Sequence, residues 1–242
     1  MGITTIGSHA FSGNGYYLKS IILPDSITTI GYYAFNYCRG LITITLPHNL
    51  TTINSTAFTD CNRLIEVCNQ SSLSITAGGG SNGYVGYYAK NVYTNAEDSN
   101  ISIDANNFVT YNDNGNILLL EYNGNNTNII LPNTISSIYF GAFANNQIVE
   151  DIDITSNVLS FDDYAFSNSK VATISIPSTI TSIGMYAFAY SKDLTLMSYG
   201  STESDWNNIS KGSYWDSDAG TYNPQIQGRY IIRCTDGDII VN

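Results

Sequence analysis

Residues 18–40 read LKSIILPDSITTIGYYAFNYCRG, and residues 41–63 read LITITLPHNLTTINSTAFTDCNR. Each stretch has 23 residues, and the apolar residues of the second stand at the same places as those of the first. The most specific coincidences are Leu23-Pro24 with Leu46-Pro47, Ala34-Phe35 with Ala57-Phe58, and Cys38 with Cys61. Self-similarity at a period of about 20–50 residues predicts stacked repeats rather than a single globular core.

The same template returns three times further along the chain. Its apolar positions there are Ile129, Leu131-Pro132 and Ala142-Phe143; Ile152, Ile154 and Ala165-Phe166; and Ile174, Ile176-Pro177 and Ala187-Phe188. The departures from the template are local: Asn126 and Asn69 stand in apolar positions, and Thr155 stands where the other copies have proline. We expect these copies to continue the stack.

Each copy predicts one short strand followed by turns. Ile21 and Leu23 alternate with Ser20 and Ile22, and this period of two predicts a strand with one face inward. The following proline is expected to end the strand, and Gly31 to permit a tight turn. A single repeat cannot bury its own apolar face, so neighbouring repeats must stack and their strands pair in parallel.

The pattern L-x-x-I-x-L-P-x-x-I-T-x-I-G-x-x-A-F-x-x-C resembles the leucine-rich repeat of the BspA-like, or Treponema pallidum, type. The resemblance implies a leucine-rich-repeat solenoid: a β-rich curved superhelix of 23-residue repeats with parallel strands on the concave face and few or no long helices. Residues 64–95 resemble the irregular, lengthened repeat of that family. Within them Val85–Lys90 echoes Ile30–Phe35, with Lys90 in the phenylalanine position.

The stretch between the two groups of repeats predicts one inserted β-hairpin. Residues 108–111 and 117–122 alternate in polarity around an Asn-Gly pair, which favours a type I′ turn. We therefore expect a repeat block at 1–100 that starts in mid-repeat, the interrupting hairpin at 101–124, and a second block at 125–200. Residues 201–242 resemble the family's C-terminal capping segment.

The composition excludes several classes of function. Nine Lys and Arg against 20 Asp and Glu give a net charge of −11, and nucleic-acid binding needs clustered basic residues. No apolar run approaches the about 20 residues that cross a bilayer. The first residues are neither basic nor apolar, unlike a signal peptide. We expect no nucleic-acid partner and no membrane insertion.

A polar stripe on the concave face is the first candidate site. Strand positions facing away from the core are mostly small and polar, with acidic residues near the middle, and the concave faces of solenoids are common binding surfaces. A merely solvated sheet face is the alternative. The candidate residues are Ser20, Thr43, Thr45, Glu66, Asn128, Asp151, Asp153, Thr173 and Ser175.

Tyrosines form the second candidate site. The chain has 19 of them, and several precede the Ala-Phe pair or its counterpart. They could form a partly exposed aromatic stripe that stacks on sugars or protein, or they could simply cover the edges of the repeats. The residues are Tyr32, Tyr33, Tyr87, Tyr88, Tyr164 and Tyr186.

The remaining reactive residues indicate neither catalysis nor a metal site. The four cysteines have no zinc-binding spacing and are expected to be free, buried thiols. In other repeats Asn or Ser takes the place of Cys38 and Cys61, so we expect a small group bonded to the turn backbone. The acidic pairs match no calcium-binding loop. His9 and His48 lie in different repeats, so no nucleophile, base and orienting group converge.

These observations predict a non-enzymatic binding module without a cofactor. The resemblance implies a surface-exposed or secreted protein, with adhesion to a protein or glycan on host or neighbouring cells. The alternative is a structural spacer or assembly unit of an extracellular appendage or virion. An uncapped N-terminal repeat would favour that alternative, because its open apolar end could associate end to end with another copy.

Overall fold

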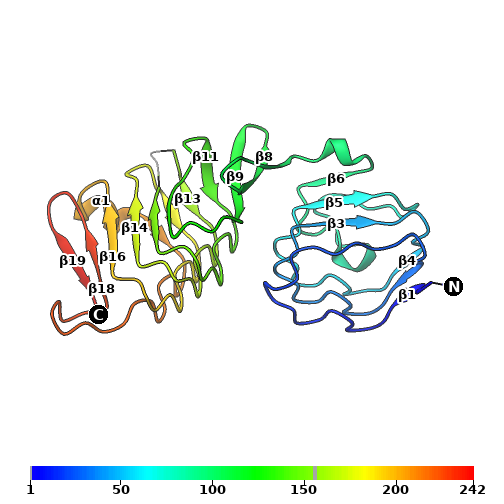
Figure 1. Ribbon diagram of the computed structural model, residues 1–242, viewed down its shortest axis with the longest axis horizontal. Coiled ribbons are helices and arrows are strands. Elements are labelled where there is room, and N and C mark those ends of the chain that lie inside the picture. Colours follow the sequence, from blue (N-terminus) through cyan, green and yellow to red (C-terminus); the bar gives the residue numbers. More distant parts are fainter. Residues whose placement is uncertain (1, 155–156) are drawn as a thin grey trace. The chain divides into compact units, whose positions relative to one another are not determined.

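A computed structural model describes residues 2–154 and 157–242. Thr155, one of the departures from the repeat template, lies outside the described residues. The chain divides into two compact units, unit 1 at Met1–Asn100 and unit 2 at Ile101–Asn242 (Figure 1). Each unit is a coil of short strands joined by turns.

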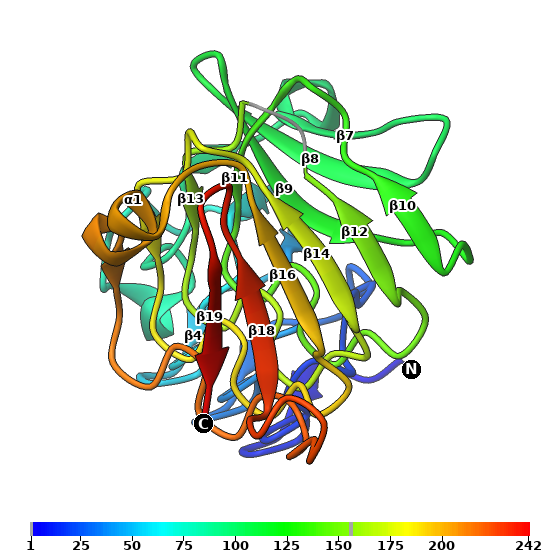
Figure 2. The ribbon, with the colours of Figure 1, turned by 90° about the vertical axis from the view of Figure 1, so that its left-hand side faces the viewer.

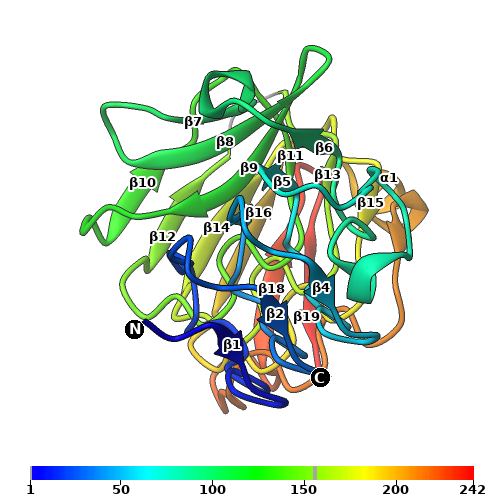
Figure 3. The same ribbon diagram turned by 90° about the vertical axis from the view of Figure 1, so that its right-hand side faces the viewer.

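Unit 1 contains two parallel sheets. The short-strand sheet has the order β1 (Thr5–Ile6), β2 (Thr29–Ile30) and β4 (Thr52–Ile53), which lie in sequence along the coil (Figure 3). The long-strand sheet has the order β3 (Thr43–Leu46), β5 (Glu66–Asn69) and β6 (Asn91–Tyr93). Two short 3₁₀ helices, η1 (Asn82–Tyr84) and η2 (Ala96–Asp98), flank β6 in the sequence.

Unit 2 repeats this arrangement with more strands (Figure 2). Its long-strand sheet runs β10 (Asn128–Ile130), β12 (Asp151–Asp153), β14 (Thr173–Ile176), β16 (Leu196–Tyr199), β18 (Tyr230–Arg233) and β19 (Asp238–Val241). All neighbours in it are parallel except β18 and β19. The short-strand sheet runs β17 (Ser210–Lys211), β15 (Ser182–Ile183), β13 (Ser160–Phe161), β11 (Ile135–Ile138), β9 (Asn116–Tyr122), β8 (Phe108–Asp113) and β7 (Ile101–Ile103).

The predicted solenoid of parallel strands is confirmed, and so is the scarcity of helix. The one α-helix assigned in the described residues is α1 (Glu203–Asn208). It begins with a capping box, in which the Thr202 hydroxyl accepts a hydrogen bond from the Asp205 amide at 3.1 Å. Trp206 lies buried on this helix beside Tyr199 and Trp215.

The predicted hairpin is present between β8 and β9. Its two-residue turn, Asn114-Gly115, joins the paired residues Asp113 and Asn116, and both turn residues have positive φ, 52° and 94°. Positive φ at both positions is what a type I′ turn requires. The hairpin also belongs to the solenoid, because β9 pairs in parallel with β11 and so extends the short-strand sheet of unit 2.

The Ala-Phe pair forms the centre of the stack. Phe143, Phe166 and Phe188 are fully buried and stack face to face, with ring centroids 5.2 and 4.7 Å apart. The Phe166 amide donates a hydrogen bond of 2.7 Å to the carbonyl of Ala187 in the next repeat. Stacked rings and repeat-to-repeat backbone bonds thus recur together along the coil.

Glycine is required in the turn for a reason other than the expected conformational freedom. A Cβ on Gly31 would lie 2.6 Å from the backbone nitrogen of Ser8, and one on Gly184 would lie 2.4 Å from that of Asp163. Glycine is therefore required by the close approach of the neighbouring repeat. The left-handed turn residues are instead tyrosines such as Tyr33 and Tyr37, with φ of 54° and 57°.

Two local expectations are wrong. Residues 18–24 form no strand, although Leu23 still packs into the core while Ile22 is 94% exposed. Among the described residues β3 pairs only with β5, so this segment does not join the long-strand sheet of unit 1.

The proposed match of residues 85–90 to Ile30–Phe35 also fails. The Phe58 amide donates to the carbonyl of Gly83, as Phe35 donates to that of Ala57, so Gly83 occupies the alanine position. Lys90 instead begins the approach to β6, with its amide donating to the Ile65 carbonyl at 2.8 Å. The extra residues of the lengthened repeat shift the register here.

Candidate functional site

The long-strand sheet of unit 2 places the predicted polar residues in two parallel rows. Ile129, Ile152 and Ile174 point inward and are buried, so the residues on either side of them face outward. One row contains Asn128, Asp151, Thr173 and Leu196; the other contains Ile130, Asp153, Ser175 and Ser198. We call Asn128, Asp151, Asp153, Thr173 and Ser175 the polar stripe.

Hydroxyl groups of β14 hold both carboxylates of the stripe. Thr173 donates a hydrogen bond to Asp151, and Ser175 donates one to Asp153, each from the next strand of the sheet. The Ser175 hydroxyl oxygen also accepts from the Ile154 amide at 3.0 Å. These bonds orient the carboxylates before any partner arrives, which lowers the entropic cost of binding.

The stripe lines an open hollow of about 480 Å³. Leu196 and Ser198 continue its wall beyond the carboxylates, and Ile130, 67% exposed, supplies apolar surface at the other end. Ionised carboxylates only accept hydrogen bonds, so the hollow suits a partner that presents hydroxyl, amide or cationic donors. In the ranges 2–154 and 157–242, no three His, Cys, Asp or Glu side chains are grouped as metal ligands.

Arg233 is a residue of this face that the sequence did not predict. It pairs with Ser198 in the sheet register and so extends the row of Asp153 and Ser175. Its guanidinium forms an exposed ion pair with Asp238 of β19, with Nε and Oδ1 3.1 Å apart. The irregular spacing between β16 and β18 hides this alignment, because it breaks the repeat period.

In unit 1 the predicted stripe is interrupted at Glu66. Thr43 and Thr45 are accessible, but Glu66 is fully buried. Its carboxylate accepts hydrogen bonds from the Ser99 hydroxyl at 2.6 Å and the Asn100 amide at 2.7 Å. Glu66 is therefore not part of a binding surface, because the segment at 99–100 covers it and its carboxylate is hydrogen-bonded to that segment.

Ser20 remains exposed, but it lies in the segment without a strand. The exposed part of the stripe in unit 1 is consequently short and mostly uncharged. The polar stripe of unit 2 is the larger candidate surface.

The six predicted tyrosines do not form one stripe. In unit 2, Tyr164 stacks on Tyr186 at 5.2 Å, and Tyr186 stacks on Tyr214 at 5.4 Å. In unit 1, Tyr33 stacks on His9 at 5.1 Å. The first of these ladders has left-handed backbone at each tyrosine, which places successive rings in line along the coil.

The other predicted tyrosines lie apart from the ladders. Tyr32 precedes Tyr33 and is 51% exposed. Tyr87 and Tyr88 contact each other edge to face, with centroids 4.9 Å apart, and line a separate pocket in unit 1. Spacing from the Ala-Phe pair could not place them, because the lengthened repeat shifts the register.

All four cysteines are free and buried, as predicted. Cys61 Sγ lies 3.0 Å from the carbonyl oxygen of Phe35, and the Ser191 hydroxyl, in the equivalent position, donates to that of Phe166 at 2.7 Å. The predicted small group bonded to the turn backbone is thus confirmed. Burial raises the pKa of Cys38 to about 11, so the thiol stays protonated near neutral pH.

Comparison with known families decides the classification. The sequence model described as "BspA type Leucine rich repeat region" matches residues 1–79 and 120–222 in six copies. The chain belongs to the BspA-type leucine-rich repeat family. A search of curated proteins gives no match. In the described residues, no helix has the length and apolar character needed to cross a bilayer.

Several solved structures are similar to this BspA-type chain. A leucine-rich repeat protein from Eubacterium ventriosum is 20% identical with a TM-score of 0.48, and the match covers 90% of this chain and 63% of that one. A leucine rich cell surface protein from Faecalibacterium prausnitzii is 20% identical with a TM-score of 0.33, covering 86% and 60%. The pneumococcal vaccine antigen PcpA is 14% identical with a TM-score of 0.46, covering 89% and 72%. The chain thus spans about three fifths of the length of the first two.

Proposed function

We propose that the chain is a non-enzymatic binding module of a surface or secreted protein, and that it adheres to a protein or glycan through the polar stripe of unit 2. One observation carries this proposal: Asp151 and Asp153, each held by a hydroxyl of β14, lie side by side on the wall of an open hollow. The surface location follows from the resemblance to the family and is part of the proposal.

The chemistry of the stripe favours binding over catalysis. Both histidines of the sequence, His9 and His48, lie in unit 1, so unit 2 supplies no imidazole base of its own to the stripe. The stripe instead offers fixed acceptors, flanking hydroxyls and the exposed Ile130. Such a surface can bond the hydroxyls of a sugar or the amides and cations of a polypeptide. Its regular spacing of one strand per repeat suits an extended partner that makes many weak contacts.

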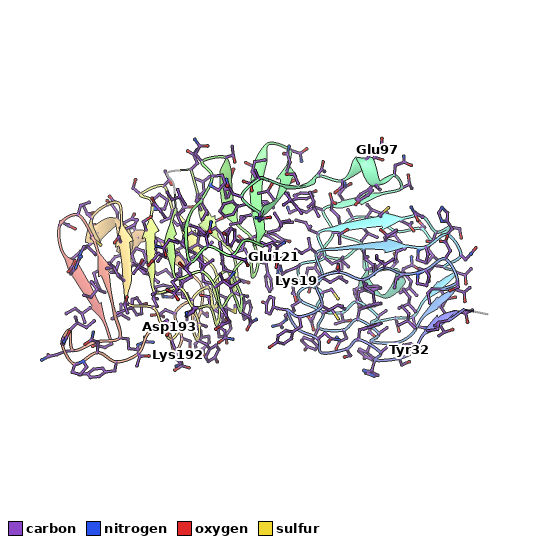
Figure 4. The ribbon with its side chains drawn as sticks, in the orientation of Figure 1. Lys19, Tyr32, Glu97, Glu121, Lys192 and Asp193 are labelled. Carbon is purple, nitrogen blue, oxygen red and sulfur yellow. The ribbon has the colours of Figure 1, made fainter. Side chains whose placement is uncertain are left out.

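The test is a binding panel of extracellular-matrix proteins, mucins and glycans. The native chain is compared with the double variant Asp151→Lys, Asp153→Lys. The control is Glu97→Lys, Asp193→Lys, which changes the net charge by the same amount. Glu97 lies on η2 in unit 1 and Asp193 in a turn of unit 2 (Figure 4); both are exposed, and neither belongs to the polar stripe or lines its hollow.

The proposal expects at least a tenfold loss of affinity in the stripe variant, because opposite charges would replace oriented acceptors. The control should bind like the native chain. Equal weakening of both variants would show a nonspecific charge effect and contradict the proposed site. Binding to no member of the panel would favour the spacer or assembly alternative over adhesion.

A further inference from the structure

A second pocket lies in unit 1, where the lengthened repeat departs from the template. Its volume is about 210 Å³, and its wall is formed by Tyr84, Tyr87, Tyr88, Thr56, Thr59 and Asp60. Pockets for drug-sized molecules are larger, about 300–1,000 Å³. The size therefore fits a single compact chemical group.

Tyr87 lies at right angles to both of the other tyrosine rings that line the pocket. Tyr84 and Tyr87 have centroids 5.7 Å apart and planes 86° apart, and Tyr87 and Tyr88 have centroids 4.9 Å apart and planes 87° apart. A sugar ring stacks on one flat aromatic platform, whereas perpendicular rings surround a compact group from several sides. The faces of such rings carry negative electrostatic potential, which attracts cations.

The backbone positions Tyr84 in an unfavourable conformation. Asn82, Gly83 and Tyr84 all have left-handed φ, 49°, 66° and 67°. Gly83 is packed against the neighbouring repeat, since a Cβ there would lie 2.5 Å from the carbonyl oxygen of Asn54. Left-handed tyrosines also occur in the ordinary turns of the coil, so this backbone fixes the position of Tyr84 without by itself marking a functional site.

Two polar side chains accompany the rings. Asp60 supplies a carboxylate. Burial of Tyr88 is the main cause that raises the pKa of its hydroxyl, and the negative charge of Asp60 raises it further. Thr59 Oγ1 is buried, and no atom of the described residues is a hydrogen-bond partner for it. The guanidinium of Arg39 lies 5.4 Å from the centre of the Tyr37 ring and is not among the lining residues, but its positive charge acts on Tyr88 and partly offsets the rise in that pKa.

We propose that this pocket binds a compact organic ammonium group, with Tyr84, Tyr87 and Tyr88 around the cation and Asp60 balancing its charge. The same chemistry could be presented by a lysine side chain of a protein or by a small amine or quaternary ammonium compound. The net charge of −11 favours the approach of either cation. This site lies in unit 1 and does not depend on the function proposed for the polar stripe.

The test is a titration of the intact chain, followed by the NMR signals of its tyrosine rings. The probes are n-butylammonium, n-butyltrimethylammonium, their neutral counterpart n-butanol, N-acetylglucosamine, and a short lysine-containing peptide. Both cations are expected to bind, and n-butanol is not. Binding of the peptide above the free amine would identify a protein lysine as the source, and equal binding would identify a small compound.

Two variants and one control locate the site. Tyr87→Leu is expected to weaken cation binding about fivefold to tenfold, the effect of losing one aromatic wall. Asp60→Asn keeps the shape and is expected to weaken it about tenfold and to reduce its salt dependence. The control, Tyr17→Leu, changes a tyrosine that is 89% exposed and outside the pocket, and should bind like the native chain.

Several outcomes would overturn the proposal. Equal binding of n-butanol and the cations would show an apolar pocket, and binding of the sugar alone would show a glycan site. Failure of both cations to bind would also overturn it. So would an unchanged cation affinity in Asp60→Asn. Thermal unfolding of each variant shows whether it is folded. If Tyr87→Leu does not fold, Asp60→Asn still tests the site.

Discussion

Replacing Glu66 tests whether its buried carboxylate holds the segment at 99–100 in place. The Glu66 carboxylate is fully buried and accepts four hydrogen bonds, from Ser99, Asn100, Tyr93 and Asn91 at 2.6, 2.7, 3.3 and 3.4 Å. If the residue belonged to an exposed stripe, its substitution would change stability little. Because it anchors the segment that covers it, Glu66→Ala should destabilise unit 1.

The magnitude follows from the two short bonds. Each hydrogen bond to a charged group contributes about 1.5–3 kcal/mol, so the bonds from Ser99 and Asn100 together contribute about 3–6 kcal/mol. Part of this is offset, because removing Glu66 also removes the cost of burying a charge. We expect Glu66→Ala to lower the free energy of unfolding of unit 1 by about 3 kcal/mol. Glu66→Gln can still accept from the Asn100 amide, so we expect a loss of about 1 kcal/mol.

The assay is urea denaturation followed by circular dichroism, together with amide hydrogen exchange of residues 98–100. Trp206 and Trp215 are the two tryptophans of the sequence, and both lie in unit 2, so their fluorescence reports on that unit separately. The exposed Glu97→Gln serves as the control in unit 1. Unchanged stability and unchanged exchange at the Asn100 amide in Glu66→Ala would refute this reasoning.

Three further predictions concern the turns and the cap. Gly184→Ala should lower the free energy of unfolding by about 1–3 kcal/mol, because its Cβ would meet backbone at 2.4 Å, whereas Gly7→Ala, with nothing within 4 Å, should not; equal effects in urea denaturation would contradict this. The Ser201 hydroxyl, more than any other group, holds the pKa of Asp205 below its usual range. The resulting stabilisation is present above the carboxyl's unfolded pKa and lost as the pH falls through the lower folded pKa, so Asp205→Asn should reduce Tm at pH 7 and leave it unchanged in strong acid; a Tm difference independent of pH would oppose this. Burial raises the pKa of Cys38 to about 11, so Ellman's reagent at pH 8 should react slowly with the folded protein and fully after denaturation; prompt reaction would argue against a buried thiol.

The repeat period alone predicts most of the fold. A period of 23 residues with coincident apolar positions requires stacking, because no single repeat can bury its own apolar face. The same alternation correctly placed Ile152 and Ile174 inward and Asp151 and Asp153 outward in the long-strand sheet. The Asn-Gly pair likewise identified the hairpin turn.

Prediction failed where the period changes. Local similarity predicts Lys90 in the phenylalanine position, but the extra residues before it move the chain along the coil. The pocket lined by Tyr84, Tyr87 and Tyr88 arises at the same place, and no spacing rule could have assembled it. Such departures from the repeat are where unique side-chain clusters can form.

The sequence by itself determined the class of fold, the repeat length, the inward and outward faces of most strands, and the acidic character of the polar stripe. These are local and periodic properties, since the same short pattern acts in each repeat. Only the tertiary structure decided that Glu66 is covered, that Arg233 joins the face of unit 2, and that three tyrosines line one open pocket. Each of those depends on a segment outside the repeat period packing against one within it, and a periodic pattern contains no information about such contacts.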